Sequence, residues 1–594
     1  MTLVTAAVDA SLEQATDRAG WIRITGLPGG ESPCKQGAHM RSIFLSLSPV
    51  LALSLAMLPG AAAQQQKKSE PAPAAKAAEK TPAQEESVRP AAPPKEPPAE
   101  KPEAGGGGPK SKELKWDMTE QAPAVTHHTI KVHGKTLNYT ATAGRLPIKD
   151  PTGKIEAEMF YVAYTLDGAE ASRRPLTFAF NGGPGSASIW LHMGALGPRK
   201  VLLEPEGWMP ASPYRLMDNP DTPLDQSDLV LVDAIGTGFS RPADLETGKK
   251  FWGLRGDAEA FGEFIRLYIT RNERWSSPLY LLGESYGTTR SAAVAGYLID
   301  RGIAFNGIIL LSTVLDFETL ATTQRNDEAY ILTLPSFTMI AAYHKKLAPE
   351  LMQELATTRA EVEKWAATDY TAALAKGDAL TPEERQAVIA QLARFTGLKP
   401  ELIDQANLRI DVRTFTHNLL GEQKLRVGRL DGRYTGPDPQ GFLETQFYDP
   451  TGAETGPPFT AVFNDYVRRE LKYETDMPYY TSAGQLASSS QEQSFFQRWE
   501  WGPGMGFPDT ASALRAAMVK DRYLKVLVME GYYDLATPFW AADYTFNHLD
   551  LSPEYRKNLS FAHYDSGHMV YLRSESLAQF HNDVDGFITS TMPK

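Results

Sequence analysis

The stretch Leu279-Tyr-Leu-Leu-Gly283-Glu284-Ser285-Tyr286-Gly287 decides the fold of this chain. It joins a short apolar run to the pattern Gly-x-Ser-x-Gly, and a helical pattern with an Ala, Val and Leu face follows over Thr288–Asp300. In such a strand–turn–helix context the serine hydroxyl is presented outward, because the flanking glycines relieve crowding in the turn. The motif alone is short, and a glycine-rich loop with a capping serine is the alternative. The context favours Ser285 as an exposed nucleophile.

Four other runs share the apolar, nearly uninterrupted character of the strand before Ser285. Strands that are covered on both faces have this composition, which is typical of a parallel sheet with helices on each side. Helical patterns between the runs predict an open, doubly wound α/β sheet. The five predicted strands are Leu176–Phe180, Leu229–Val232, Leu279–Leu282, Ile308–Leu311 and Val526–Val528.

The flanking segments differ from this core pattern. Thr129–Val132 and Thr136–Ala143 alternate apolar and polar residues and predict a hairpin, and Ile155–Tyr164 predicts a third strand. Between Phe317 and Trp501 the alternation stops, and within this segment Leu347–Leu398 is rich in Ala, Glu and Leu at helical spacing. We expect a catalytic core formed by 113–316 and 503–594, with 317–502 inserted as a largely helical cap over the carboxyl ends of the strands.

A second glycine-rich stretch, Asn181-Gly182-Gly183-Pro184-Gly185, follows the predicted strand that ends at Phe180. Acyl transfer needs backbone N–H groups directed at a developing oxyanion, and a Gly-Gly pair permits that close approach. A plain turn and a phosphate-binding loop are the alternatives. The phosphate loop fits less well, because no Lys-Ser or Lys-Thr follows the glycines.

A serine nucleophile needs a base, and the base needs an orienting carboxylate. Hydrolases with this kind of turn carry them in the order Ser, Asp, His. Asp534 follows the predicted strand at Val526, and His568 lies in Phe561–Met569, for which we expect a glycine-containing loop. His563 is the competing base and Asp565 the competing acid.

Composition excludes several classes of protein. The chain has 594 residues, a formal net charge of −12 and ordinary fractions of hydrophobic and charged residues, 42% and 22%. The negative charge argues against nucleic acid as the main partner. Cys34 is the single cysteine, so an intrachain disulfide, a thiolate zinc site and an iron–sulfur cluster are excluded. No two-histidine metal pattern stands on a predicted helix, and we expect no metal and no cofactor.

The sequence pattern of the first hundred residues predicts a targeting segment followed by a tether. Met40 and Arg41 precede an apolar run that ends in Ala61-Ala-Ala63, which predicts a signal peptide over 40–63 and makes 1–39 a mis-called upstream extension. Residues 64–112 are rich in Pro, Ala, Lys and Glu and lack aromatic residues, which predicts a disordered tether. The expected mature protein is periplasmic or extracellular and is not inserted in a membrane.

Taken together, these motifs resemble the serine carboxypeptidase family of the α/β-hydrolase superfamily, in a bacterial form without disulfides. They run in family order along the chain: Asn181–Gly185, Gly197-Pro198, Val232–Ser240, Gly283–Gly287, Gly531–Asp534 and Gly567–Met569.

The resemblance implies an α/β-hydrolase fold and release of C-terminal residues from peptides with a free C-terminus. It implies Ser285 as the nucleophile, His568 as the base and Asp534 as its partner. It further implies that Gly183 and Tyr286 supply the N–H groups of an oxyanion hole.

The resemblance also implies that Asn181 and Glu284 bind the terminal carboxylate of the substrate. Two positions depart from the family pattern: Ala179 replaces a tryptophan, and Ala195 replaces a second glutamate. Tyr571 stands where a proline is common. With one carboxyl group in place of two, we expect a weaker preference for acidic pH.

Two other functions remain open at the level of sequence. An esterase or acyltransferase uses the same nucleophile and oxyanion hole, because these groups do not choose the acceptor. The alternative that is not an enzyme is a catalytically silent binding protein, held by the tether.

Overall fold

The computed structural model describes residues 115–438, 449–486, 499–502 and 506–592. The predicted upstream extension, signal peptide and tether lie outside these residues. All elements below belong to the part of the chain from Ala104 onward.

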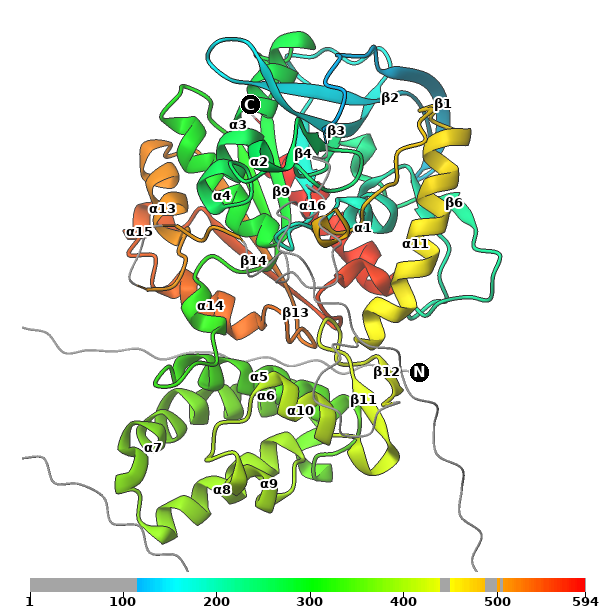
Figure 1. Ribbon diagram of the computed structural model, residues 1–594. Coiled ribbons are helices and arrows are strands. Elements are labelled where there is room, and N and C mark those ends of the chain that lie inside the picture. The colour runs from blue at the N-terminus through cyan, green and yellow to red at the C-terminus, as the bar shows by residue number, and fades with distance from the viewer. Residues whose placement is uncertain (1–114, 439–448, 487–498, 503–505, 593–594) are drawn as a thin grey trace, which may run out of the picture. The chain divides into compact units, whose positions relative to one another are not determined.

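A large mixed sheet forms the centre of the fold, in the order β1-β2-β3-β7-β4-β9-β10-β13-β14, with β8 paired to β3 (Figure 1). The six strands from β7 to β14 are parallel, whereas β1, β2 and β3 are antiparallel and β3 meets β7 antiparallel. The strands are β1 Ala124–Val132, β2 Lys135–Lys149, β3 Ile155–Leu166, β4 Leu176–Phe180, β7 Asp228–Val232, β8 Arg241–Pro242, β9 Leu279–Ser285, β10 Gly307–Thr313, β13 Lys525–Gly531 and β14 Leu559–Tyr564.

The apolar runs of the sequence are the parallel strands, so the predicted α/β fold is confirmed. One expectation was wrong. Phe561–Tyr564 belongs to edge strand β14, and the loop that carries His568 begins only after it. This strand is hard to recognise from the sequence. Most of its side chains are partly or fully exposed, so the strand lacks a continuous apolar run.

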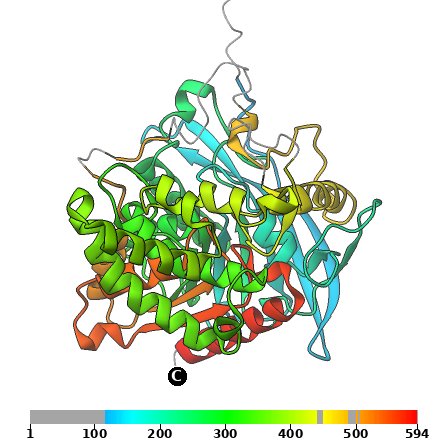
Figure 2. The same cartoon turned by 90° about the horizontal axis from the view of Figure 1, so that it is seen from below.

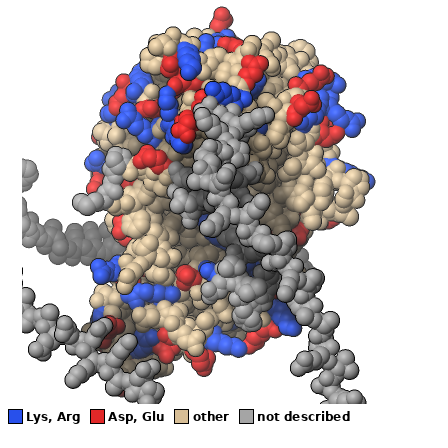
Figure 3. Space-filling view, viewed as in Figure 1, with Lys and Arg blue, Asp and Glu red and all other residues tan. Residues whose placement is uncertain are grey.

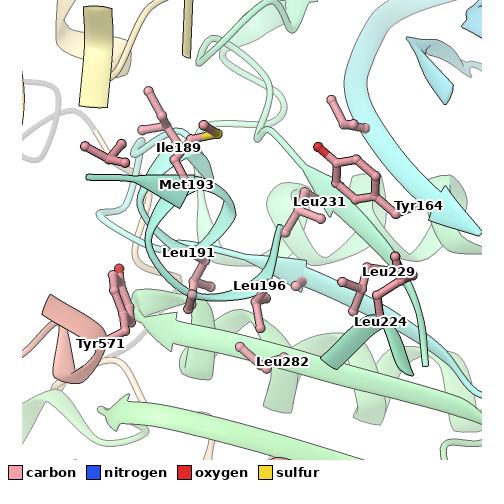
Figure 4. Packing of buried hydrophobic residues seen from close by; sticks show 14 of the residues in the cluster. Tyr164, Ile189, Leu191, Met193, Leu196, Leu224, Leu229, Leu231, Leu282 and Tyr571 are labelled. Carbon is pink, nitrogen blue, oxygen red and sulfur yellow. The ribbon is translucent and has the colours of Figure 1, made fainter. Parts of the chain in front are cut away.

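Alternate side chains of the strands enter two different apolar clusters, one on each face of the sheet. On one face Phe178, Leu281 and Leu310 pack with helices α3, α4, α13 and α14. On the other face Leu231 and Leu282 pack with the short helix α1 and the helices α11 and α16 (Figure 4). These helices are α1 Ile189–Leu191, α3 Leu254–Arg271, α4 Tyr286–Ile299, α11 Pro450–Arg469, α13 Ala511–Lys520, α14 Phe539–Asn547 and α16 Ser574–Thr591.

A third apolar cluster lies in a helical layer between β10 and β13 in the sequence. Its helices lie below the sheet in Figure 1 and in front of it in Figure 2. Thr381 caps one of them with a capping box, and Pro382 stands in its first turn. The helices are α5 Glu328–Tyr343, α6 Leu355–Trp365, α7 Thr371–Lys376, α8 Pro382–Thr396, α9 Pro400–Gln405 and α10 Val412–Asn418.

We call this helical layer the cap. Two short strands, β11 Leu425–Val427 and β12 Thr435–Pro437, form a ribbon beside it. Helix α11 also falls within the predicted insertion, yet its Phe459 and Phe463 pack against the sheet cluster. The sequence limits of the cap at 317 and 502 stay a prediction.

Charged side chains of both signs are interspersed on the face shown in Figure 3. Within the described ranges, no helix combines the length and apolar character needed to cross a membrane.

Candidate active site

Ser285 is the last residue of β9, and α4 begins at the next residue. Its backbone has φ 61° and ψ −132°, a conformation that side-chain-bearing residues seldom adopt. The turn is tight: a Cβ on Gly283 would lie 2.1 Å from the carbonyl oxygen of Gly287. The two glycines of the motif therefore allow the chain to reverse here and hold Ser285 at the end of the strand.

The glycine-rich loop after β4 lies directly against this turn. A Cβ on Gly182 would lie 2.4 Å from the backbone nitrogens of Tyr286 and Gly287, so no side chain fits there. Gly183 has a φ of 106°, which favours glycine. Gly183, Ser285 and Tyr286 line one cavity. The structure thus brings together the two predicted N–H donors and the predicted nucleophile.

Buried polar contacts hold the glycine-rich loop after β4 in position. Arg290 of α4 donates to the carbonyl oxygen of Asn181 at 2.7 Å and pairs with the buried Asp257 of α3 at 2.7 Å. The backbone N–H of Ser188 donates to Asp233 at 2.8 Å. Because both carboxylates come from other elements of the core, the loop position is set by the packed fold.

His568 lies against Asp534, with Nδ1 and Oδ2 2.7 Å apart. Thr537 contacts both residues: its hydroxyl donates to Asp534 Oδ2 at 2.7 Å and lies 3.2 Å from His568 Nδ1. Burial alone would lower the pKa of His568. The adjacent carboxylate of Asp534 and the charge of Glu284 outweigh this effect, so that the pKa is raised.

The loop around His568 is also held by residues between β11 and β12. The N–H of His568 donates to the carbonyl oxygen of Leu430 at 2.7 Å, and the N–H of Gly567 donates to Asp431 at 3.1 Å. Asp431 in turn pairs with the buried Arg433 at 2.6 Å. These supports come from the predicted insertion, and no motif in the sequence indicated them.

The competing base and acid lie elsewhere. His563 is on β14, where its ring stacks on Tyr532 and its Nε2 lies 3.6 Å from Asp543. The backbone carbonyl of Asp565 accepts a hydrogen bond from Arg573. Of the two candidate pairs, only His568 and Asp534 contact each other among the described residues.

Glu284 precedes Ser285 and is buried, with an exposed fraction of 2%. Burial raises its pKa to about 7, although contacts with His568, Tyr571 and Asn181 act in the opposite direction. Asn181 accepts a hydrogen bond from the N–H of Leu191 through Oδ1, and its amide donates toward Glu284. A carboxyl group that is half protonated near neutral pH therefore lies beside the predicted nucleophile.

Tyr571 is a neighbour of Glu284 to which the sequence assigned no role. Its hydroxyl donates to Glu284 Oε2 at 2.8 Å, and the side chain is buried beside Leu191 (Figure 4). Its ring fills the space next to Gly194, where a Cβ would lie 2.5 Å from the ring. Ala195, the position expected to carry a second glutamate, is buried in the same turn of chain. The only sequence signal for Tyr571 was its departure from proline.

A cavity of about 880 Å³ opens beside Ser285. Residues of the core, such as Thr537 and Gly183, line one part of it, and residues of the predicted insertion, such as Val412 and Arg429, line another. A cavity of this size accommodates several residues of an extended peptide or a small organic ligand.

Residues 133–402 match the family model described as serine carboxypeptidase. A comparison with curated protein sequences finds no match.

The chain is also similar, at low identity, to solved structures, of which two are given. A prohormone-processing carboxypeptidase from Saccharomyces cerevisiae is 16% identical, with a TM-score of 0.48, and the match covers 76% of this chain and 91% of that one. Proline iminopeptidase from Mycobacterium smegmatis is 14% identical, with a TM-score of 0.32 and coverage of 76% and 98%.

The close contact at Gly182 should set the position of the loop relative to the N–H of Tyr286. We expect Gly182→Ala to slow labelling of Ser285 by a fluorophosphonate on the order of 100-fold, because the new methyl group pushes the loop off the N–H of Tyr286. The rate is followed by mass spectrometry. Gly421→Ala is the matched control, since a Cβ at that position meets no atom within 4 Å. Equal labelling rates in the two variants would show that the contact does not set the donor geometry.

Proposed function

Because residues 133–402 match the serine carboxypeptidase family model, we propose that the protein hydrolyses C-terminal residues from peptides through Ser285, His568 and Asp534. The observation that carries this proposal is the buried Glu284 beside Ser285, in contact with Asn181 and Tyr571. A general acyl hydrolase has no need of a buried, protonatable carboxyl group at that place.

In the proposed mechanism the hydroxyl of Ser285 attacks the scissile carbonyl carbon, and His568 Nε2 takes its proton. Asp534 orients the ring through the 2.7 Å contact with Nδ1 and stabilises the imidazolium that forms. The N–H groups of Gly183 and Tyr286 stabilise the oxyanion. His568 then protonates the leaving amine. Water hydrolyses the acyl-enzyme ester by the same steps, with His568 as base.

The free C-terminus of the substrate would bind to Glu284 and Asn181. An ionised Glu284 repels a carboxylate, whereas a protonated one donates a hydrogen bond to it. With a pKa of about 7, Glu284 carries the required proton in a large fraction of molecules at neutral pH. Tyr571 would set the orientation of the carboxyl group, because its hydroxyl donates to Oε2.

The function is tested by digestion of peptides with free and amidated C-termini, read by mass spectrometry. We expect stepwise loss of residues from the free C-terminus and little cleavage of the amidated form. Ser285→Ala and His568→Ala should each lower kcat on the order of 10⁴-fold or more, and the double variant should be little worse, because the residues act as one unit. His563→Ala is the control and should retain activity. Cleavage of both peptide forms at internal bonds would contradict a carboxypeptidase.

The buried carboxyl group predicts a particular pH dependence. Relative to a simple ester substrate, kcat/KM for free-acid peptides should rise as pH falls through about 7, because protonation of Glu284 removes a repelling charge. Glu284→Gln keeps a donor without a titration and should flatten this ratio. Tyr571→Phe removes a hydrogen bond that lowers the pKa of Glu284, so the rise should move to higher pH. A ratio that is unchanged in Glu284→Gln would exclude Glu284 from binding the terminal carboxylate.

We propose further that the protein is exported and that cleavage follows Ala63, as the small-residue end of the apolar run indicates. Sequencing of the N-terminus of exported protein should then begin at Gln64. An intact Met1 or Met40 on exported protein would contradict cleavage.

A further inference from the structure

Three distant parts of the chain bring histidine and aspartate side chains together outside the site around Ser285. His133 lies in the turn between β1 and β2, and Asp225 is the last residue of the short 3₁₀ helix η2 Pro223–Asp225. His581 and Asp585 lie one turn apart on α16. None of these residues takes part in the proposed hydrolytic mechanism.

The side chains converge on one point. A ring nitrogen of each histidine and a carboxylate oxygen of Asp225 lie within 4.8 Å of one another. His133 Nδ1 is 3.8 Å from Asp225 Oδ2, and His581 Nε2 is 3.2 Å from Asp585 Oδ2. The two imidazole rings have centroids 4.5 Å apart.

The orientation of His581 is fixed from outside the cluster. Its Nδ1 lies 3.1 Å from the backbone carbonyl oxygen of Asp221, to which it donates. This contact directs Nε2 toward the cluster, where a metal ion would take the place of the proton on Nε2. Metal-ligating histidines are held in this way, by a hydrogen bond from the other ring nitrogen to a carbonyl or carboxylate.

Each carboxylate is only partly satisfied within the protein: Gln226 donates to Asp225 Oδ2 at 3.4 Å, and His581 Nε2 lies 3.2 Å from Asp585 Oδ2. Asp225 Oδ1 and Asp585 Oδ1 are buried and have no hydrogen-bond partner among the described residues. The Asp225 side chain is nine-tenths buried, with an exposed fraction of 9%. A buried carboxylate without a partner is costly. A proton on His581 would add one positive charge, yet both orphan oxygens would still lack a donor.

We propose that His133, Asp225 and His581, with Asp585 as fourth ligand, bind a zinc ion. Two imidazoles and two carboxylates form a ligand set that zinc takes in tetrahedral geometry, at about 2.0–2.2 Å from each ligand. The 4.8 Å spacing is that of His133, Asp225 and His581 alone, and Asp585 is placed by its contact with His581, so the four ligands would have to contract on binding. His133 permits it, because it lies in a turn and its side chain is 47% exposed.

Such an ion would have a structural role. It would tie the β1–β2 hairpin and the segment before β7 to α16, close to the C-terminus. The chain has a single cysteine, Cys34, so an intrachain disulfide cannot make this connection. Binding to the folded state alone raises stability with the concentration of free metal.

The test uses the full chain purified without a histidine tag and stripped with EDTA. Titration with zinc chloride in a calorimeter should show one saturable equivalent and raise the thermal midpoint by at least about 3 °C. His133→Ala and Asp225→Asn should each weaken binding on the order of 100-fold and remove the thermal shift. His127→Ala is the matched control, an exposed histidine on the same hairpin, and should bind zinc as the unaltered chain does.

Three results would overturn the proposal. The first is absence of saturable zinc binding, and the second is an equal thermal shift in His133→Ala and the unaltered chain. The third is binding of magnesium as tight as that of zinc, which would show that the imidazoles are not ligands. Asp225→Asn gives a further discrimination in metal-free protein. We expect its stability to hold or rise, because a buried negative charge is removed, whereas a histidine–aspartate ion pair would make the same variant less stable.

Discussion

The site depends on one steric constraint, the approach of two backbone segments that leaves no room for a Cβ. Gly182 lies so close to the nitrogens of Tyr286 and Gly287 that any side chain would collide with them. The parallel pairing of β4 with β9 sets the segments side by side, since the strand ends at Phe180 and Gly283 are in register. The strained turn at Ser285 persists because packing on both faces of the sheet holds it in place.

Much of this arrangement follows from the sequence, for identifiable reasons. Five buried strands are continuous apolar runs, and Ser285 and the Asn181 loop each follow one of them directly. Carboxyl ends of parallel strands share one edge of the sheet, so their juxtaposition could be expected before the structure was known. Strand β14 could not be predicted from an apolar run, because it is an edge strand with exposed side chains, among them Phe561.

Contacts between residues far apart in the sequence could not be predicted in this way. Leu430 and Asp431 contact the His568 loop from the ribbon beside the cap. No motif or periodicity around these two residues predicts the contacts. Tyr571 is a different case, because the sequence does mark its position. Its position was noticed as a departure from the family pattern, but a single sequence does not say which side chain its hydroxyl meets. The same holds for His133 and His581, which are separated by most of the described chain.

The charge state of the site follows from the proximity of Glu284 and His568. Each affects the pKa of the other: His568 lowers that of Glu284, and Glu284 raises that of His568. Two arrangements with the same number of protons therefore compete, a neutral pair and an ion pair, and their titrations belong to the pair. Burial of both side chains favours the neutral pair, because charged groups lose more solvation than neutral ones. That arrangement provides both a basic His568 and a Glu284 able to donate to a carboxylate. A substrate carboxylate bound at Glu284, as proposed, would favour the neutral pair further, since the added negative charge opposes ionisation of Glu284. In the proposed mechanism, substrate binding therefore keeps the proton on Glu284 and leaves His568 free to act as the base.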